Sequence, residues 1–509
     1  MALQAVVLIA YFASLLPLAV LGLHRLALVW LRTRPDPDAE PEVLDTWPMV
    51  TVQVPLYNER YVAERIIGAV AALDYPRDRL EIQVLDDSTD DTRDRVDRVA
   101  HRLRQAGAPI EVLRREQRVG FKAGALEAGM RRARGSLIAV LDADFVPEPD
   151  FLRRMVPWFR EDVGMVQARW GHLNAEESWL TRAQATLLDG HFVTEHGARY
   201  RSGRWFNFNG TAGVWRRQAI EDAGGWEHDT LTEDLDLSYR AQLAGWRFVY
   251  RDEVVVRAEL PADMGAFKAQ QNRWARGGIQ VARKLLGRIW RSRVPLRLKV
   301  EASFHLLSNL AYPLLVALAA LLPFAVWARG SGVAPALLGL DVVLFLAATV
   351  SVFVFYGAAV LHLGGRGTGV RLWGLPVVMA LGLGLAIAQT RAVWQGVTGS
   401  VGCFARTPKK GGASRREGYG ARSDRVLVLE ALMAVWQLVG LGWAVQMGWV
   451  ASLPFMALFA AGYLAVVLQA VIDAGRSRGR RADRTVRLAA SRDGGGAPRR
   501  QGTRVLDPR

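Results

Sequence analysis

Two aspartates separated by a single alanine, Asp142 and Asp144, come directly after the apolar run 137–141. Carboxylates two residues apart can converge on one hard divalent cation, such as Mg²⁺ or Mn²⁺, and leave open positions for diphosphate oxygens. The alternative is a solvated turn, because Asp-x-Asp is common in turns. At the end of an apolar run, and in the company of two further acidic clusters, we interpret the pair as a metal site.

A second acidic pair, Asp86 and Asp87, also follows an apolar run. A carboxylate at the end of a strand can accept hydrogen bonds from the base or the ribose of a nucleotide. It can equally cap the helix that Ser88 and the following residues would start, and one aspartate can do each. Lys122 lies between glycines and predicts either a nucleotide contact or an ordinary surface lysine.

The third cluster is Thr232-Glu233-Asp234, and the leucine spacing after it predicts a helix that begins near Thr232. The helix dipole favours an ionised carboxylate at this position, and such a group could take a proton from an acceptor hydroxyl. A simple acidic turn explains the same residues. The loop 208–213 is polar and contains glycines, and its aromatic neighbours suit either a sugar ring or the edge of a core.

The stretch Gln270-Gln271-Asn272-Arg273-Trp274 lies within an amphipathic segment, residues 267–286, shortly before a series of apolar spans. A basic amphipathic helix beside a membrane span is typical of the membrane interface. Trp274 could stack on a sugar ring, and Arg273 could neutralise a leaving diphosphate. A surface anchor is the alternative, and the two roles are compatible.

Strands and helices alternate around the acidic clusters. We expect strands at residues 50–56, 81–85, 110–113 and 136–141, and helices at residues 59–72, 92–106 and 122–133. This alternation predicts a parallel sheet with helices on both faces, and such sheets bind ligands outside the carboxyl ends of their strands. Two of the acidic pairs fall at those ends, so the sequence predicts a nucleotide site there.

Long apolar segments occur at residues 3–23, 304–328, 338–363, 373–390, 426–447 and 451–473. Each is about long enough to cross a hydrocarbon core of roughly 30 Å at about 1.5 Å per residue. The first segment lacks a basic start and a cleavage site, and arginines follow it. We therefore expect an uncleaved anchor with the N-terminus outside the cell.

The segment 373–390 differs from the others in the charge that follows it. If it crossed the membrane, the Arg- and Lys-rich loop 396–425 would lie outside the cell, against the positive-inside rule. We therefore predict five spanning helices and one interfacial or re-entrant segment, with that loop in the cytoplasm. The tail 474–509 is rich in Arg and Gly, and its composition predicts disorder.

The overall charge of +16 over 509 residues has a ready explanation in this topology. Much of it flanks the apolar segments, so the positive-inside rule accounts for it and we expect no nucleic-acid partner. Cys403 is the single cysteine, which excludes a disulfide framework and a cysteine-based zinc cluster.

Taken in order, the motifs resemble those of the processive glycosyltransferases of family 2. The motifs that carry this resemblance are residues 53–59, 86–90, 142–144, 232–234 and 270–274. The set is similar to the cellulose synthase superfamily, which includes hyaluronan and chitin synthases. It most resembles the glucomannan 4-β-mannosyltransferase (cellulose-synthase-like A) group, through residues 84–90, 142–150, 166–170 and 208–215.

The resemblance implies a role for each matching residue. Asp87, with Asp86, would bind the base and ribose of the donor, and Lys122 would lie near the nucleotide. The metal and the diphosphate would be held by Asp142 and Asp144. Asp234 would be the general base, and the acceptor end and the diphosphate would be bound by Glu233, Gln270, Arg273 and Trp274.

The resemblance also implies a candidate gating loop at Phe404, Thr407 and Lys409. Its family pattern is Phe-x-Val-Thr-x-Lys, and this chain has Arg406 where the pattern has valine. That departure puts the gating role in question.

These expectations combine into an α/β protein with a cytoplasmic GT-A (Rossmann-like) domain inserted between transmembrane helices. Its expected parts are an N-terminal anchor (1–34), the GT-A domain (45–265), interfacial helices (266–300), a membrane domain (301–473) and a basic disordered tail (474–509). The membrane domain would contain four spans, an interfacial segment at 373–395 and a cytoplasmic loop at 396–425.

The activity implied is that of a metal-dependent, inverting glycosyltransferase in the inner or plasma membrane. It would use a nucleotide sugar, GDP-mannose or UDP-glucose, to extend a β-linked polysaccharide. The alternative is an enzyme that adds one sugar to make a glycolipid. Expected partners are the sugar donor, a glycan or lipid acceptor, the bilayer and accessory export subunits.

Overall fold

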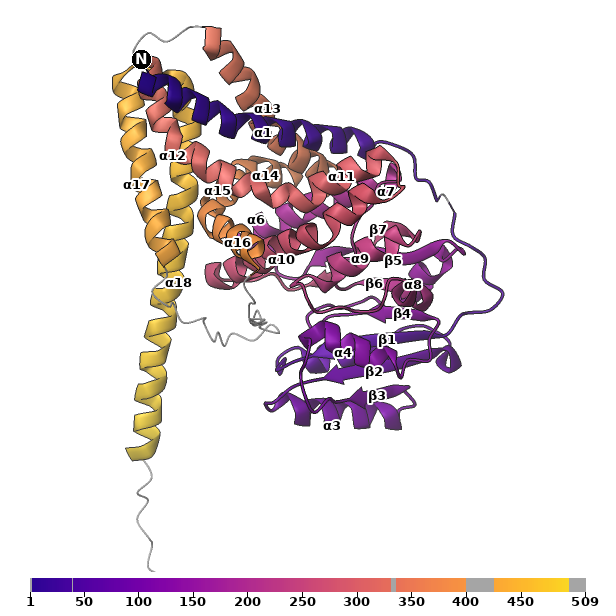
Figure 1. The fold of residues 1–509 in the computed structure, drawn as a ribbon. Helices are drawn as coiled ribbons and strands as arrows, with labels where there is room; N and C mark the ends of the chain where they lie inside the picture. Colours follow the sequence, from indigo (N-terminus) through magenta and orange to yellow (C-terminus); the bar gives the residue numbers. More distant parts are fainter. Residues whose placement is uncertain (1, 39, 331–335, 400–424, 494–509) are drawn as a thin grey trace, which may run out of the picture.

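A computed structural model describes residues 2–38, 40–330, 336–399 and 425–493, and it combines a mixed α/β domain with a bundle of long helices (Figure 1). The candidate gating residues Phe404, Thr407 and Lys409 lie outside the described residues. The expected class, a GT-A-like α/β domain flanked by candidate membrane helices, is confirmed.

One seven-stranded sheet forms the centre of the α/β domain, in the order β3-β2-β1-β4-β6-β5-β7. The strands are β1 (Val50–Leu56), β2 (Leu80–Asp86), β3 (Ile110–Leu113), β4 (Leu137–Val140), β5 (Val163–His172), β6 (Gly213–Arg216) and β7 (Arg247–Ala258). The first four pair in parallel, as the alternating pattern predicts. β1, β2 and β4 are buried almost throughout because helices cover both faces of a parallel sheet.

The sheet is mixed because of β6, a strand that the alternating pattern does not predict. This four-residue strand runs antiparallel to both β4 and β5, and β5 pairs in parallel with β7. A strand so short, entered from a long loop, carries too few residues for a recognisable pattern. Its place in the sheet is set by hydrogen bonding on both sides, and it brings the loop 206–212 to the carboxyl end of β4.

Helices surround the sheet and connect its strands. They are α2 (Ala63–Ala71), α3 (Thr92–Gln105), α4 (Phe121–Met130), α5 (Phe151–Met155), α6 (Trp179–Asp189), α7 (Gly197–Arg201), α8 (Arg217–Asp222) and α9 (Glu233–Leu243). A π-helical segment, Gly190–His196, joins α6 to α7. The predicted elements before residue 142 therefore appear in the expected order, with ends shifted by a few residues.

The remaining helices include the long apolar ones. They are α1 (Ala2–Arg32), α10 (Met264–Arg291), α11 (Leu296–Leu307), α12 (Ala311–Gly330), α13 (Ala336–Leu363), α14 (Thr368–Trp373), α15 (Leu375–Gly384), α16 (Ala386–Thr398), α17 (Arg425–Gln446) and α18 (Leu453–Asp493). Among the described residues, five segments are long and apolar enough to cross a membrane: Ala2–Arg32, Leu296–Ala328, Gly339–Leu363, Arg425–Gln446 and Leu453–Arg476. They correspond to the five predicted spans.

The apolar segment 373–390, which we expect to be interfacial or re-entrant, belongs to a bent pair of helices. Thr368–Gly384 and Ala386–Thr398 meet at 46°, which makes the pair either a broken span or a re-entrant loop. α15 packs against α18, and α16 packs against α10, so the bend joins the membrane bundle to the α/β domain. An interfacial or re-entrant placement stays a prediction.

The tail differs from its expectation over its first part. α18 continues to Asp493, so residues 474–493 are helical where the composition predicts disorder. Alanine and arginine are good helix formers, and the preceding span supplies a helix for them to extend.

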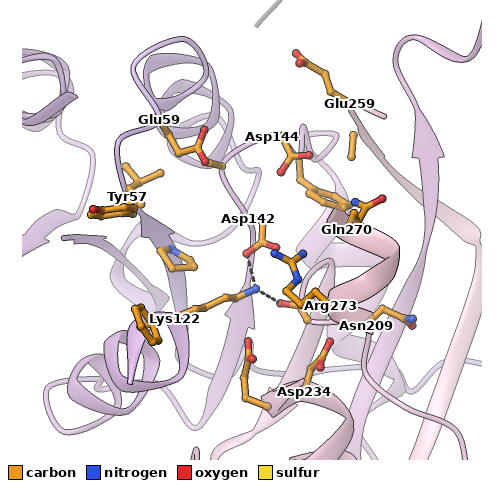
Figure 2. A pocket seen from close by; sticks show the side chains of 18 of the residues that line it. Tyr57, Glu59, Lys122, Asp142, Asp144, Asn209, Asp234, Glu259, Gln270 and Arg273 are labelled. Carbon is orange, nitrogen blue, oxygen red and sulfur yellow. Dashed lines mark hydrogen bonds and ion pairs between the residues drawn. The ribbon is translucent and has the colours of Figure 1, made fainter. Parts of the chain in front are cut away.

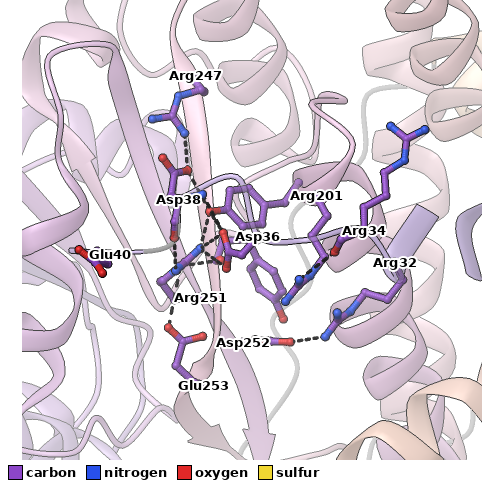
Figure 3. Close-up of polar contacts among 12 residues, drawn as sticks. Arg32, Arg34, Asp36, Asp38, Glu40, Arg201, Arg247, Arg251, Asp252 and Glu253 are labelled. Carbon is purple, nitrogen blue, oxygen red and sulfur yellow. Dashed lines mark hydrogen bonds and ion pairs between the residues drawn. The ribbon is translucent and has the colours of Figure 1, made fainter. Parts of the chain in front are cut away.

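The linker after α1 is fastened to the α/β domain by ion pairs (Figure 3). Asp36 accepts from Arg251 at 2.9 Å, and Asp38 accepts from Arg247 at 2.6 Å. Arg32, at the end of α1, pairs with Asp252 at 2.6 Å. Because Arg251 and Asp38 are buried, breaking one pair would leave an uncompensated buried charge, which fixes α1 relative to β7.

Candidate active site

A cavity of about 200 Å³ opens at the carboxyl ends of β1, β2 and β4. The N-terminal end of α4, the loop before β6, the start of α9 and the first half of α10 complete its wall (Figure 2). Parallel sheets place ligand sites at this edge, as the sequence predicts. Its lining includes the predicted residues Asp87, Lys122, Asp142, Asp144, Glu233, Asp234, Gln270, Arg273 and Trp274.

Lys122 is the cation at the centre of the cavity. Its ammonium group lies 2.5 Å from Asp142 Oδ1 and donates to the carbonyl oxygen of Gly210 at 2.8 Å. Burial lowers the pKa of Lys122, but the negative charges of Asp142, Glu233 and Asp234 outweigh it and raise the pKa above its ordinary value. Lys122 is therefore a permanent cation, and it is not a surface lysine.

Asp142 and Asp144 line one wall of the cavity just after β4. The backbone N–H of Asp142 donates to Thr211 Oγ1 at 2.8 Å, which ties this turn to the loop before β6. The Asp144 side chain is buried, with 7% of the residue exposed. Two carboxylates on one wall supply the hard oxygen ligands that Mg²⁺ and Mn²⁺ prefer, so the donor set fits a divalent cation.

The two aspartates after β2 point to different places. Asp87 lines the cavity, and its carboxylate is gripped by Arg115 through Nε at 3.1 Å and Nη2 at 2.5 Å. Asp86 is not among the lining residues. Its carboxylate pairs with Arg114 at 2.9 Å and accepts from the backbone N–H of Ser88 at 3.0 Å, four residues before α3 begins. The N-cap residue of α3 is Asp91, so Asp86 does not cap this helix. Asp86 therefore supports the turn that presents Asp87.

Asp234 lies in the first turn of α9, against the loop before β6. Its Oδ1 accepts from the backbone N–H of Leu235 at 2.8 Å. Gly210, with φ +81°, approaches so closely that a Cβ there would lie 2.9 Å from Asp234 Oδ2. Burial and the adjacent charge of Glu233 raise the pKa of Asp234 to about 7, against the opposing pull of Lys122 and Arg273. A carboxyl with this pKa can exchange a proton near neutral pH.

Gln270, Arg273 and Trp274 enter the cavity from α10. Their spacing places them on one face of the helix, and the Trp274 ring lies 6.5 Å from that of Trp170, measured between centroids. α10 itself begins at Asp263, whose carboxylate caps the backbone N–H of Ala266 at 2.8 Å. The amphipathic segment thus delivers its polar residues to the cavity.

Some lining residues escaped the sequence interpretation. Tyr57, Arg118 and Trp170 belong to the cavity, and the Arg118 guanidinium lies over the Tyr57 ring at 3.4 Å. Tyr57 and Trp170 lie within the segments 53–59 and 166–170 that carry the family resemblance, but those segments predict no site role for them, and Arg118 belongs to none of the motifs. Only the fold brings β5, which carries Trp170, next to α10.

An acidic cluster on α9 and the loop before it lies apart from this cavity. Oxygens of Glu227, Asp229 and Asp236 lie within 4.8 Å of one another, a spacing suited to a metal. The ammonium group of Lys284 contacts all three, at 2.5, 2.8 and 2.9 Å. The lysine therefore supplies the compensating charge, and the cluster is an ion-pair network.

A second, larger cavity of about 500 Å³ lies among α1, α11, α12, α13, α15 and α18. Its lining is largely apolar and aromatic, and it meets the first cavity at shared residues. Both cavities are lined by Trp170, Asn209, Thr232, Asp234, Gln270 and Trp274. Asp234 therefore stands where a polar cavity in the α/β domain joins a cavity among the helices.

Residues 48–277 match the family described as glycosyltransferase-like family 2. Glucomannan 4-β-mannosyltransferase 1 from Oryza sativa subsp. japonica is 43% identical over 294 residues, which are 55% of this chain and 56% of the rice protein. Glucomannan 4-β-mannosyltransferase 2 from Arabidopsis thaliana is 44% identical over 265 residues, 51% of this chain and 50% of that protein. The chain spans about half the length of these curated relatives.

A solved mannosyltransferase from Pyrobaculum calidifontis, in complex with GDP-Man and Mn²⁺, has a similar structure. It is 24% identical with a TM-score of 0.50, over 71% of this chain and 97% of that chain. This likeness concerns the fold, and it agrees with the GT-A type that the motifs predict.

Proposed function

We propose that this chain, whose residues 48–277 match glycosyltransferase-like family 2, is a membrane-bound, inverting glycosyltransferase that extends a β-linked polysaccharide from a nucleotide sugar. The observation that carries the proposal is the position of Asp234 at the junction of the two cavities. The polar cavity suits a charged donor, and the aromatic cavity among the helices suits a glycan.

GDP-mannose is the donor we favour over UDP-glucose. Both plant relatives are named as glucomannan mannosyltransferases, and the archaeal neighbour was solved with GDP-Man. Asp87 would receive the base or ribose at the far wall, held ready by Arg115. Arg118 also lines that wall, so its guanidinium group would add to the positive charge that Lys122 offers to the nucleotide.

The reaction follows from the charges around the cavity. Asp234 takes the proton from the acceptor hydroxyl, and that oxygen attacks the anomeric carbon as the bond to the diphosphate breaks. Inversion of an α-linked donor makes a β bond. Arg273 and Lys122 are cations that face Asp234, and their positive charges stabilise the departing diphosphate. A divalent cation held by Asp142 and Asp144 would neutralise further diphosphate charge when bound.

The membrane helices would determine the path that the product takes out of the active site. With the N-terminus outside, the α/β domain lies in the cytoplasm, where nucleotide sugars are available. A chain growing from Asp234 would enter the cavity among the helices, and accessory export subunits would continue its path. An acceptor lipid in the same cavity would make the product a glycolipid.

Membranes that contain the chain test this proposal. They are incubated with radiolabelled GDP-mannose or UDP-glucose and with Mg²⁺, Mn²⁺ or a chelator, and membranes without the chain serve as the control. We expect a size ladder from GDP-mannose that a β-mannan hydrolase degrades, and loss of the signal with the chelator. A single labelled glycolipid as the product would show that the chain adds one sugar to a lipid and does not make a polymer. The absence of transfer from either donor would refute the proposal.

A further inference from the structure

Three polar side-chain atoms at the junction of the cavities are buried without a hydrogen-bond partner among the described residues. They are Trp170 Nε1, Asn209 Oδ1 and Thr232 Oγ1. All three residues line both cavities. A buried donor or acceptor without a partner costs free energy. A ligand rich in hydroxyl groups would supply the missing hydrogen bonds to these three atoms.

Asn209 is the most closely held of the three. Its backbone N–H donates to Gln167 Oε1 at 3.1 Å, and Gln167 is fully buried. The next residue, Gly210, is the one that approaches Asp234. Asn209 and Asp234, which we propose as the base, both line the junction of the two cavities (Figure 2).

A chain of polar side chains leads to Asn209; Arg199 at its start is buried, and the others are half-buried. Arg199 donates to Glu195 at 2.7 Å, Glu195 contacts His191 Nδ1 at 2.8 Å, and His191 Nε2 contacts Asn209 Nδ2 at 2.9 Å. Arg199 also pairs with Glu301 of α11 at 3.1 Å. The chain thus connects a membrane helix with the wall of the active site.

The charge of Glu195 decides how the hydrogen bonds are directed. Burial raises the pKa of Glu195, but Arg199 and His191 hold it well below its ordinary value, so the group is ionised and can only accept. His191 Nδ1 must then carry the proton, and Nε2 faces Asn209 Nδ2, an amide nitrogen that can only donate. Asn209 consequently donates to His191 through Nδ2, which turns its Oδ1 away from the ring.

The segment that carries His191 and Glu195 is itself unusual. Both residues belong to the π-helical segment Gly190–His196. Gly190 lies against α13, since a Cβ there would be 2.4 Å from the Tyr356 ring. π-helical turns are rare and occur often at functional sites, because the extra residue reorients side chains.

We propose that His191 is a positioning residue, which holds the Asn209 amide so that its Oδ1 accepts a hydrogen bond from a hydroxyl group of the acceptor sugar. This inference rests on the proposed function. The acceptor is favoured over the donor because His191 and Glu195 line only the cavity among the helices. The charged groups proposed to bind the donor line the other cavity.

The test compares steady-state kinetics of full-length variants with a soluble β-mannooligosaccharide as the acceptor. We expect His191→Ala to raise the KM for the acceptor about tenfold, as expected for the loss of an oriented hydrogen bond, and to leave the KM for the donor within about twofold. His191→Gln keeps an oxygen that can accept from Asn209 Nδ2, so it should restore most of the acceptor affinity. His101→Ala, on the exposed face of α3, is the matched control.

A double variant shows whether His191 acts through Asn209. If it does, His191→Ala combined with Asn209→Ala should be no worse than Asn209→Ala alone, because the effects of coupled residues are not additive. Additive effects, or equal changes in the KM values of donor and acceptor, would overturn the inference. If His191→Ala also abolishes nucleoside diphosphate binding, the variant has lost more than one hydrogen bond. The KM values of His191→Gln and Asn209→Ala for donor and acceptor then test the inference by the same criteria. A wild-type protein that transfers no sugar would instead refute the proposed function.

Discussion

The proton chemistry of the site depends on one carboxyl group and the charges that surround it. Asp234 is buried beside a second carboxylate, Glu233, and faces the cations Lys122 and Arg273. These opposing influences leave its pKa at about 7. A base with this pKa can be deprotonated in the cytoplasm and still accept a proton from a sugar hydroxyl.

The pH dependence of the reaction follows from this pKa. In the proposed mechanism the transfer requires the carboxylate, and a pKa of about 7 means that half of the protein lacks it at that pH. We expect kcat/KM to rise tenfold per pH unit well below 7 and to level off above it, in the free-enzyme profile. Asp234→Asn should lower kcat by about 10²–10⁴-fold and remove this pH limb.

Asp94→Asn, an exposed substitution on α3, is the control for this experiment and should leave the profile unchanged. An Asp234→Asn variant with wild-type turnover would show that another group accepts the proton.

At the scale of elements, a close contact between α15 and α18 determines the position of the bent pair α15–α16 in the helix bundle. α15 and α18 approach backbone to backbone, since a Cβ on Gly384 would lie 2.2 Å from the carbonyl oxygen of Gly462. Small residues permit such contacts between helices in membranes. The contact holds α15 beside the cavity that its Val378 and Leu383 help to line.

Replacing Gly384 by alanine should therefore destabilise the bundle. The added methyl group has no room unless α15 moves, and overpacking of this kind costs about 1–3 kcal/mol. The thermal unfolding midpoint of the purified protein in detergent, followed by tryptophan fluorescence, measures the effect. We expect a lower midpoint for Gly384→Ala.

Gly442 on α17 is the matched control because nothing lies within 4 Å of its added Cβ. Gly442→Ala should keep the midpoint or raise it, since alanine is favoured over glycine in a helix by about 0.5–1 kcal/mol. An equal loss in both variants would mean that the tight contact at Gly384 does not decide the stability.

At the scale of the whole molecule, the arrangement of the spans agrees with one orientation. Tyr11 of α1 donates to Asp341 of α13 at 2.8 Å, and Figure 1 shows the N-terminus near the ends of α12 and α17. These ends lie away from the α/β domain. If the N-terminus is outside, as the positive-inside rule predicts, the α/β domain would be on the cytoplasmic side, and we expect the same of the loop that contains Lys410.

The single cysteine gives a direct test of this topology. Cys403 belongs to the basic loop, so a membrane-impermeant maleimide should label it in inverted vesicles and not in intact cells. A reporter fused near Lys410 should give the same answer. Labelling of Cys403 in intact cells would contradict the topology and make residues 368–398 a spanning pair.

A second variant controls for reagent access from outside. Cys403→Ser combined with Met447→Cys places the thiol between α17 and α18, at the opposite end of α17. Intact cells should label this variant.

Much of the fold and of the site was predictable because the informative patterns are local. Alternating strands and helices up to β4, the apolar spans and the acidic pairs all appear as short runs of sequence. The motifs also placed Asp142, Asp234 and Trp274 in one site before any geometry was known, and the structure brings them to one cavity.

Other features were decided only in three dimensions. The antiparallel pairing of β6, the turn of Asp86 toward Arg114 and the chain from Arg199 to Asn209 all depend on residues far apart in sequence. The same holds for the two cavities that meet at Asp234. Local patterns encode which segments are buried and which end in carboxylates, but burial, pKa and hydrogen-bond partners arise from packing between segments. The sequence by itself therefore predicts the class of chemistry and the residues that would carry it. The tertiary structure decides which of those residues meet in one cavity and how that cavity joins the one among the helices, because both depend on packing between distant segments.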